Sequence, residues 1–152
     1  MRLVDSHFSP LIHDAILEPG GYLQWGETDI SSFRVRTVSP ENGRDALYQL
    51  FKLTEELDPR LSPQWARTLL TQFLERGLEN VKCDSRNAAP HQALAMHECN
   101  LMMQELMAQT TGNKKVSQEI RGLMSDVIHQ TRQGATWDFT RLTVIGRKPD
   151  SE

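Results

Sequence analysis

An aromatic residue and two carboxylates are expected on one face of a short predicted strand, residues 22–28. Side chains alternate along an extended chain, which places Trp25, Glu27 and Asp29 on the same side. In open α/β sheets ligands bind beyond the carboxyl ends of the strands, where we expect Glu27 and Asp29. A carboxylate there could orient or deprotonate an amine, a hydroxyl or a thiol. These three residues are therefore candidates for a substrate pocket. The alternative is that Trp25 lies in the core and the two acids end the strand in solvent.

The histidines in the second half of the chain do not form a recognisable metal motif. His97 and Glu98 begin a sequence like that of zinc proteases, but Leu101 stands where the motif needs its second histidine. His91, His97 and Cys99 also lack the number and spacing of ligands that structural zinc sites use. We therefore expect no metal site.

No serine or cysteine nucleophile stands out, so no catalytic residue is assigned. Cys83 lies on a predicted strand with only Lys82 nearby, which favours a buried, inert thiol. His7 and His13 are six residues apart and do not share a helical face, so a surface or capping role is expected. Most of the methionines are expected to be deformable lining of a core, or else of a hydrophobic small-molecule pocket. They are Met96, Met102, Met103, Met107 and Met124.

Length and composition indicate one domain over residues 1–152. The chain has 20 acidic and 17 basic side chains and a formal net charge of −3. It has no long basic cluster, so nucleic acid is not an expected partner. It also lacks both the apolar core of a signal peptide and the roughly 20 apolar residues of a membrane span. Two cysteines are too few for a disulfide framework, and we expect a cytoplasmic protein without a membrane partner.

Hydrophobic periodicity and turn residues divide the chain into about five helices and three strands. The Ser-Pro pairs at Ser9-Pro10 and Ser62-Pro63 open two of the helices. Gly77, Gly112 and Gly134 end three of them, and Gly77 stands where a left-handed cap belongs, a conformation that glycine tolerates. The predicted helices cover residues 10–18, 44–57, 63–76, 90–111 and 116–133. The predicted strands cover residues 22–28, 78–84 and 137–146. A polar link, residues 30–43, follows the first strand and contains Arg34, Arg36 and Pro40.

Three passages, taken in order, resemble the S-adenosylmethionine-dependent methyltransferases of fungal small-molecule biosynthesis. The first passage, EPGGYLQWGETD at residues 18–29, is similar to the fifth strand of that fold, where an LKPGG-aromatic-L-Q-W-x-E run is common. The second, residues 65–81, resembles the following helix and the sixth strand. The third, residues 137–149, looks like the terminal strand with its GRKP ending. The resemblance spans nearly the whole chain but only the C-terminal part of the family domain.

This resemblance implies an α/β fold, namely an incomplete Rossmann-like methyltransferase fold. In that fold the last strand inserts antiparallel between the fifth and the sixth. We therefore expect a three-stranded mixed sheet in the order 22–28, 137–146, 78–84. The outer edge of strand 22–28 would then be open to pairing. We expect self-association, or a full-length methyltransferase partner, through this edge.

The resemblance also implies methyl transfer onto a nitrogen or oxygen of a small secondary metabolite. Such catalysis depends mainly on proximity and orientation, so it needs few obligatory side chains. The family holds S-adenosylmethionine on a glycine-rich turn and an acidic strand end. This chain contains no G-x-G, and we expect that it binds no S-adenosylmethionine alone. It would be a truncated member of the family. The alternatives are a non-catalytic interaction or stabilising subunit, a relic of a full-length methyltransferase, and a fragment without function.

Overall fold

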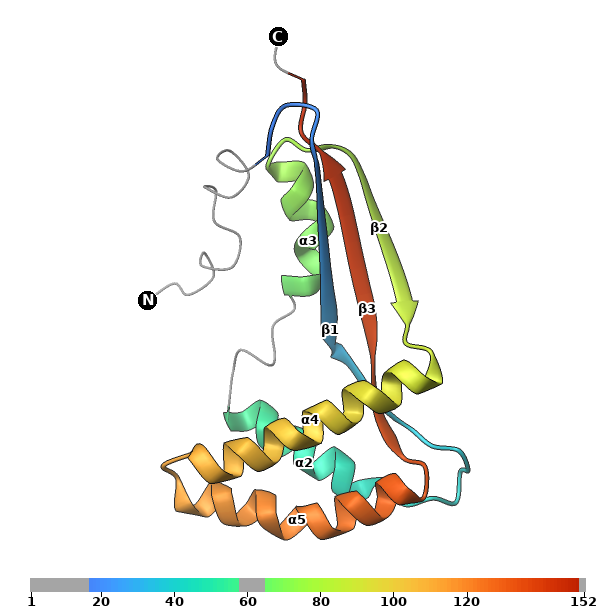
Figure 1. The fold of residues 1–152 in the computed structure, drawn as a ribbon, viewed down its shortest axis with the longest axis vertical. Helices are drawn as coiled ribbons and strands as arrows, with labels where there is room; N and C mark the ends of the chain where they lie inside the picture. The colour runs from blue at the N-terminus through green and yellow to red at the C-terminus, as the bar shows by residue number, and fades with distance from the viewer. Residues whose placement is uncertain (1–16, 58–64, 151–152) are drawn as a thin grey trace. The chain divides into compact units, whose positions relative to one another are not determined.

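The computed structural model describes residues 17–57 and 65–150 (Figure 1). They form an α/β fold with the strands β1 (Tyr22–Arg36), β2 (Glu79–Asn87) and β3 (Thr136–Arg147). The helices are α2 (Asp45–Leu57), α3 (Trp65–Glu75), α4 (Pro90–Thr110) and α5 (Lys114–Arg132). Two compact units share these residues: unit 1 holds 17–27, 65–85 and 142–150, and unit 2 holds 28–57 and 86–141. Each strand contributes residues to both units, and each unit has its own hydrophobic core.

The three strands form one sheet in the order β1-β3-β2. The expected order is confirmed, with the strand that comes last in the sequence at the centre. The sheet is antiparallel rather than mixed, because β3 is the only neighbour of each outer strand and runs against both (Figure 1). β1 and β2 therefore point in the same direction without being bonded to each other.

In unit 1, helix α3 supplies half of a small apolar core. Its residues Leu69 and Phe73 are fully buried and pack with Leu78 and Val144. Leu23, Trp25, Trp65 and Val81 are partly buried against this cluster. Gly77 has a φ of 74° just beyond the helix, which confirms the expected left-handed cap.

The end of β3 passes very close to the core of unit 1 at Gly146. A Cβ atom at this position would lie 3.0 Å from Cδ1 of Phe73 and 3.1 Å from Cβ of Leu78. Both distances are tighter than ordinary van der Waals contact. The strand can approach this closely because residue 146 has no side chain.

In unit 2, α5 packs against both α2 and α4. The core joins apolar residues of these helices to Val35, Trp137 and Phe139 of the sheet. Phe33 of β1 stacks on Phe51 of α2 with ring centroids 3.6 Å apart. The indole Nε1 of Trp137 donates a hydrogen bond to the carbonyl oxygen of Leu47 at 3.1 Å. These contacts fix α2 on strands β1 and β3.

The predicted elements agree with the structure except at the ends of the first and second strands, since β2 continues three residues past the predicted end to Asn87. The predicted polar link is wrong over residues 30–36, because β1 continues to Arg36. Phe33 and Val35 pack in the core of unit 2, while Arg34 and Arg36 alternate with them and pair with a buried carboxylate. Residues 10–16 of the first predicted helix and the Ser62-Pro63 helix start lie outside the described residues, which contain four helices. Residues 17–18 are described and are not helical.

Two expectations about burial are also wrong. Cys83 is exposed, because nearly all of β2 is exposed along its length. Met102 and Met103 are exposed on α4, whereas Met107 and Met124 pack against the core of unit 2 as expected. None of the helices in the described part of the chain is long and apolar enough to cross a membrane.

Candidate functional site

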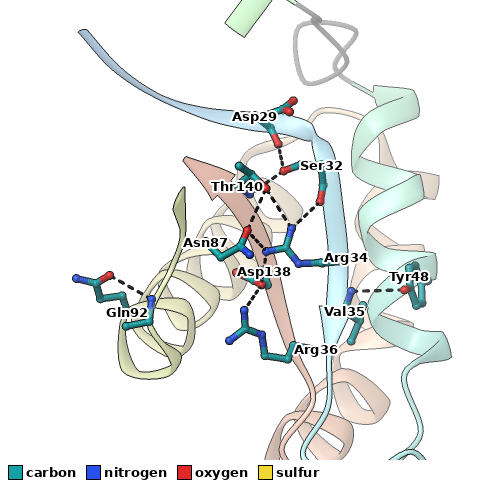
Figure 2. Close-up of polar contacts among 11 residues, drawn as sticks. Asp29, Ser32, Arg34, Val35, Arg36, Tyr48, Asn87, Gln92, Asp138 and Thr140 are labelled. Carbon is teal, nitrogen blue, oxygen red and sulfur yellow. Dashed lines mark hydrogen bonds and ion pairs between the residues drawn. The ribbon is translucent and has the colours of Figure 1, made fainter. Parts of the chain in front are cut away.

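A polar cluster lies in unit 2 at the carboxyl ends of β1 and β2 (Figure 2). At its centre, Nη2 of Arg34 and Nη2 of Arg36 each lie 2.6 Å from Oδ2 of Asp138. The Asp138 side chain is fully buried, whereas the two arginine side chains are 35% and 39% exposed. The cluster therefore joins a buried carboxylate to two guanidinium groups that reach solvent.

Arg34 is held by several hydrogen bonds from three strands. Its Nη1 donates to the carbonyl oxygen of Ser32 and to Oγ1 of Thr140, both at 3.3 Å. Its Nη2 also donates to Oδ1 of Asn87, the last residue of β2, at 2.9 Å. A guanidinium that is fixed in this way can present its remaining surface without first losing side-chain freedom.

The Ser32 hydroxyl ties the same strands together. It donates to the carbonyl oxygen of Asp29 at 2.6 Å and accepts a hydrogen bond from the backbone N–H of Thr140 at 2.7 Å. The Arg36 side chain, by contrast, makes its only hydrogen bond and ion pair among the described residues with Asp138. Arg34 is therefore the rigid cation of the cluster, and Arg36 is the adaptable one.

The cluster has unbalanced charge and one unused acceptor. Two guanidinium groups and one carboxylate leave a formal charge of +1. Oδ1 of Asp138 is buried and has no hydrogen-bond partner among the described residues. A carboxylate or phosphate could therefore bind to Arg36, and a hydrogen-bond donor would satisfy Oδ1. The hydroxyls of Ser32 and Thr140 are engaged in hydrogen bonds within the cluster, so the chemistry that the cluster supports is binding and orientation.

Trp25 and Glu27, two of the expected pocket residues, belong to unit 1. Trp25 packs against the core of that unit, and its Nε1 lies 3.5 Å from Oε2 of Glu27, at the outer limit of a hydrogen bond. The expectation that Glu27 ends the strand is wrong, because β1 continues for nine further residues to Arg36. A substrate role for the two side chains remains a prediction.

Asp29, the third expected pocket residue, lies inside β1 and belongs to unit 2. It is buried rather than solvated, and its Oδ1 accepts a hydrogen bond from the Ser31 hydroxyl. The expected position beyond the strand is again wrong, for the same reason as at Glu27. Its backbone carbonyl, through Ser32, connects it to the polar cluster.

His97 of α4 is completely buried between β3 and α5 in unit 2. Its Nδ1 accepts a hydrogen bond from the backbone N–H of Trp137 at 3.2 Å. Its Nε2 lies 2.9 Å from Oγ1 of Thr131, whose hydroxyl donates to the carbonyl oxygen of Val127. These bonds assign the proton to Nε2. Burial lowers the pKa of His97 to about 4, so the ring is neutral near pH 7.

Both ring nitrogens of His97 are thus engaged within the fold, while Cys99 is exposed. No group of three or more His, Cys, Asp or Glu side chains in the described ranges could hold a metal ion. His7 and His13 lie outside those ranges.

The sequence did contain a signal for the polar cluster. Arg34 and Arg36 alternate with Phe33 and Val35, which is the period-two pattern of a strand with one buried face. Asp138 sits between two buried aromatic residues of β3, where a carboxylate needs a cationic partner. The pairing itself was not predictable, because it joins residues about a hundred positions apart.

Comparison with known proteins gives no match for this chain, either to a family model or to a curated protein.

Proposed function

We propose that this chain is the part of an S-adenosylmethionine-dependent methyltransferase domain that carries its last three strands. In this proposal the intact domain transfers a methyl group to a nitrogen or oxygen of a small secondary metabolite, and its fold is Rossmann-like. The observation that supports it best is the strand order β1-β3-β2.

The strand order supports the proposal because it is not the one that consecutive strands usually adopt in a sheet. Strands that follow one another in sequence are usually neighbours in a sheet, so a simple meander would put β2 at the centre. Here β3 comes last in sequence and lies between the other two. The resemblance in the sequence implies the same insertion of the final strand.

The polar cluster fits a substrate-orienting role within this proposal. Ligands in open α/β sheets bind beyond the carboxyl ends of the strands, and Arg34, Arg36 and Asn87 occupy those ends of β1 and β2. S-adenosylmethionine would be held by the glycine-rich turn of the intact domain, since the present sequence has no G-x-G. The contribution of this chain would be to place the methyl acceptor.

A fusion protein tests the proposal. The cofactor-binding half of an intact small-molecule methyltransferase, ending after its fourth strand, is joined to the start of this chain. Calorimetry should detect no binding of S-adenosylmethionine to the chain alone and low-micromolar binding to the fusion. The control is a fusion that carries Val144→Asp, which places a charge at a fully buried position of β3. Low-micromolar binding by the chain alone, or equal binding by both fusions, would argue against the proposal.

A second candidate is a non-catalytic subunit that pairs through β1. The observation that favours it is the position of β1 as an outer strand of the sheet, with Tyr22 64% exposed. A second copy, or a full-length methyltransferase, would be the partner. Tyr22→Lys with Gln24→Lys should then convert an assembly into a monomer in sedimentation experiments, because lysine on an edge strand opposes pairing. An unchanged sedimentation coefficient would exclude this edge as the contact.

A further inference from the structure

Helix α4 has a buried inner face and, opposite to it, an exposed stripe of mostly apolar side chains. Its inner face holds the buried residues Ala93, His97, Gln104 and Ala108. A second set, Ala95, Cys99, Met102 and Leu106, is exposed and follows the spacing four, three, four. At about 100° per residue this spacing gives a single stripe, which points away from the inner face. We call these four residues the outer stripe.

The outer stripe contains large apolar side chains that are well exposed. Met102 is 69% exposed and Leu106 is 51% exposed, and Met103 beside them is 58% exposed. Isolated exposed apolar side chains are ordinary, but a run in helical register marks a contact surface. Methionine is flexible and polarisable, so it adapts to the shape of a partner.

Two carboxylates border one side of the outer stripe. Glu98 directly precedes Cys99, and Glu105 directly precedes Leu106, so the two acids are seven residues apart on the same border. Both are exposed, and neither side chain makes an ion pair or hydrogen bond with any residue in the described part of the chain. The surface therefore combines an apolar stripe with unneutralised negative charge.

We propose that the outer stripe of α4 binds a basic amphipathic helix of a partner protein. The apolar face of that helix would cover Met102 and Leu106, and its lysines or arginines would pair with Glu98 and Glu105. A second copy of α4 is a poorer occupant, because antiparallel pairing would bring the same acidic border of each helix together. The surface lies entirely on α4 and does not depend on the methyltransferase assignment.

The test uses the full chain and two designed peptides of the same length as α4. Both have leucine at the a and d positions of a heptad; one has lysine at the e and g positions, and the other has glutamate there. Fluorescence anisotropy should show saturable binding of the lysine peptide, about tenfold tighter than that of the glutamate peptide at low salt. The difference should shrink as salt screens the charges.

Three variants locate the site. Met102→Glu with Leu106→Glu should weaken binding of the lysine peptide by about tenfold or more, with an unchanged circular dichroism spectrum because both side chains are exposed. Glu98→Lys with Glu105→Lys should reverse the preference between the peptides. Leu74→Glu, an exposed apolar residue of α3, is the matched control and should leave binding unchanged.

Other outcomes overturn the proposal. These are no saturable binding, equal binding of both peptides, or no response to the double glutamate variant. A dimer of the chain that the same variant dissociates, with a disulfide between the two Cys99 residues on oxidation, would assign the stripe to a second copy instead. If the glutamate variant fails to fold, Glu98→Gln with Glu105→Gln still decides, because loss of the charge preference is required.

Discussion

Nη2 of Arg36 lies 2.6 Å from Oδ2 of Asp138, the same oxygen that Arg34 contacts at 2.6 Å. One oxygen of the carboxylate thus receives both cations, while the other has no partner among the described residues. The two arginines are not equivalent, because Arg34 also bonds to Ser32, Thr140 and Asn87.

Arg34→Gln should therefore destabilise the chain more than Arg36→Gln. We expect losses of about 2 kcal/mol and of about 1 kcal/mol or less, values reduced by the partial exposure of both side chains. Urea denaturation of the two variants and of the natural chain measures both losses in the free energy of unfolding. Arg141→Gln, on the same strand as Asp138 but exposed, is the control and should have almost no effect. A larger effect at Arg36 than at Arg34 would contradict this account of the cluster.

The buried His97 should make stability depend on pH in mildly acidic solution. The unfolded chain binds the proton as the pH falls below about 6.5, whereas the folded chain binds it only near 4. The contribution of the neutral His97 to the free energy of unfolding is therefore fully present above pH 6.5 and is lost as the pH falls towards 4. It amounts to about 3 kcal/mol at most.

His97→Gln retains an acceptor for the N–H of Trp137 but does not titrate. The stability difference between the natural chain and this variant should therefore shrink between about pH 7 and pH 4. Denaturation curves recorded across this range provide the measurement. Parallel pH profiles for the two proteins would show that His97 does not carry the effect.

Two glycines in the strands of unit 1 give a matched test of close packing. Gly146→Ala would place a methyl group 3.0 Å from Phe73 and should destabilise by about 1–3 kcal/mol. Gly26→Ala has no atom within 4 Å and should be neutral or slightly stabilising. Thermal unfolding of both variants distinguishes them. Equal effects would mean that strand propensity, not the contact with Phe73, determines the result.

Substitutions at Trp25 and Glu27 test whether these side chains have a structural role or a role in binding substrate. Trp25→Ala should cost about 3 kcal/mol, because the indole packs on the core of unit 1. Glu27→Gln should cost less than about 1 kcal/mol. If Glu27 contacts substrate, the Gln variant should also lower the turnover of the active fusion enzyme. Unchanged turnover would leave Glu27 with a structural role only.

The secondary-structure elements that could be predicted from the sequence are those marked by residues within or next to the element itself. Gly77 marks the end of α3, and the strand order followed from the family resemblance. The second half of β1 was missed because Ser31, Ser32, Arg34 and Arg36 read as a polar loop. Their place in a sheet depends on Asp138, a distant residue that neutralises the arginines.

The candidate site was predicted only in part. Trp25, Glu27 and Asp29 do lie in a strand, but the expected strand end was wrong because no residue between them and Arg36 stops an extended chain. The exposed methionines were misplaced for a different reason. Helical spacing identifies an apolar stripe but does not tell whether a neighbour in the same chain covers it, and the side chains of Met102 and Met103 are more than half exposed.

The central place of β3 also sets the order of events during synthesis. β1 and β2 are made first, yet each of them forms its ladder only with β3. Until residues 136–147 leave the ribosome, both earlier strands keep their hydrogen-bonding edges unused. At a translation rate of about 5–20 residues per second, the roughly 100 residues between the end of β1 and the start of β3 take about 5–20 seconds to make. Translational pausing before codon 136 should therefore lower the yield of folded protein.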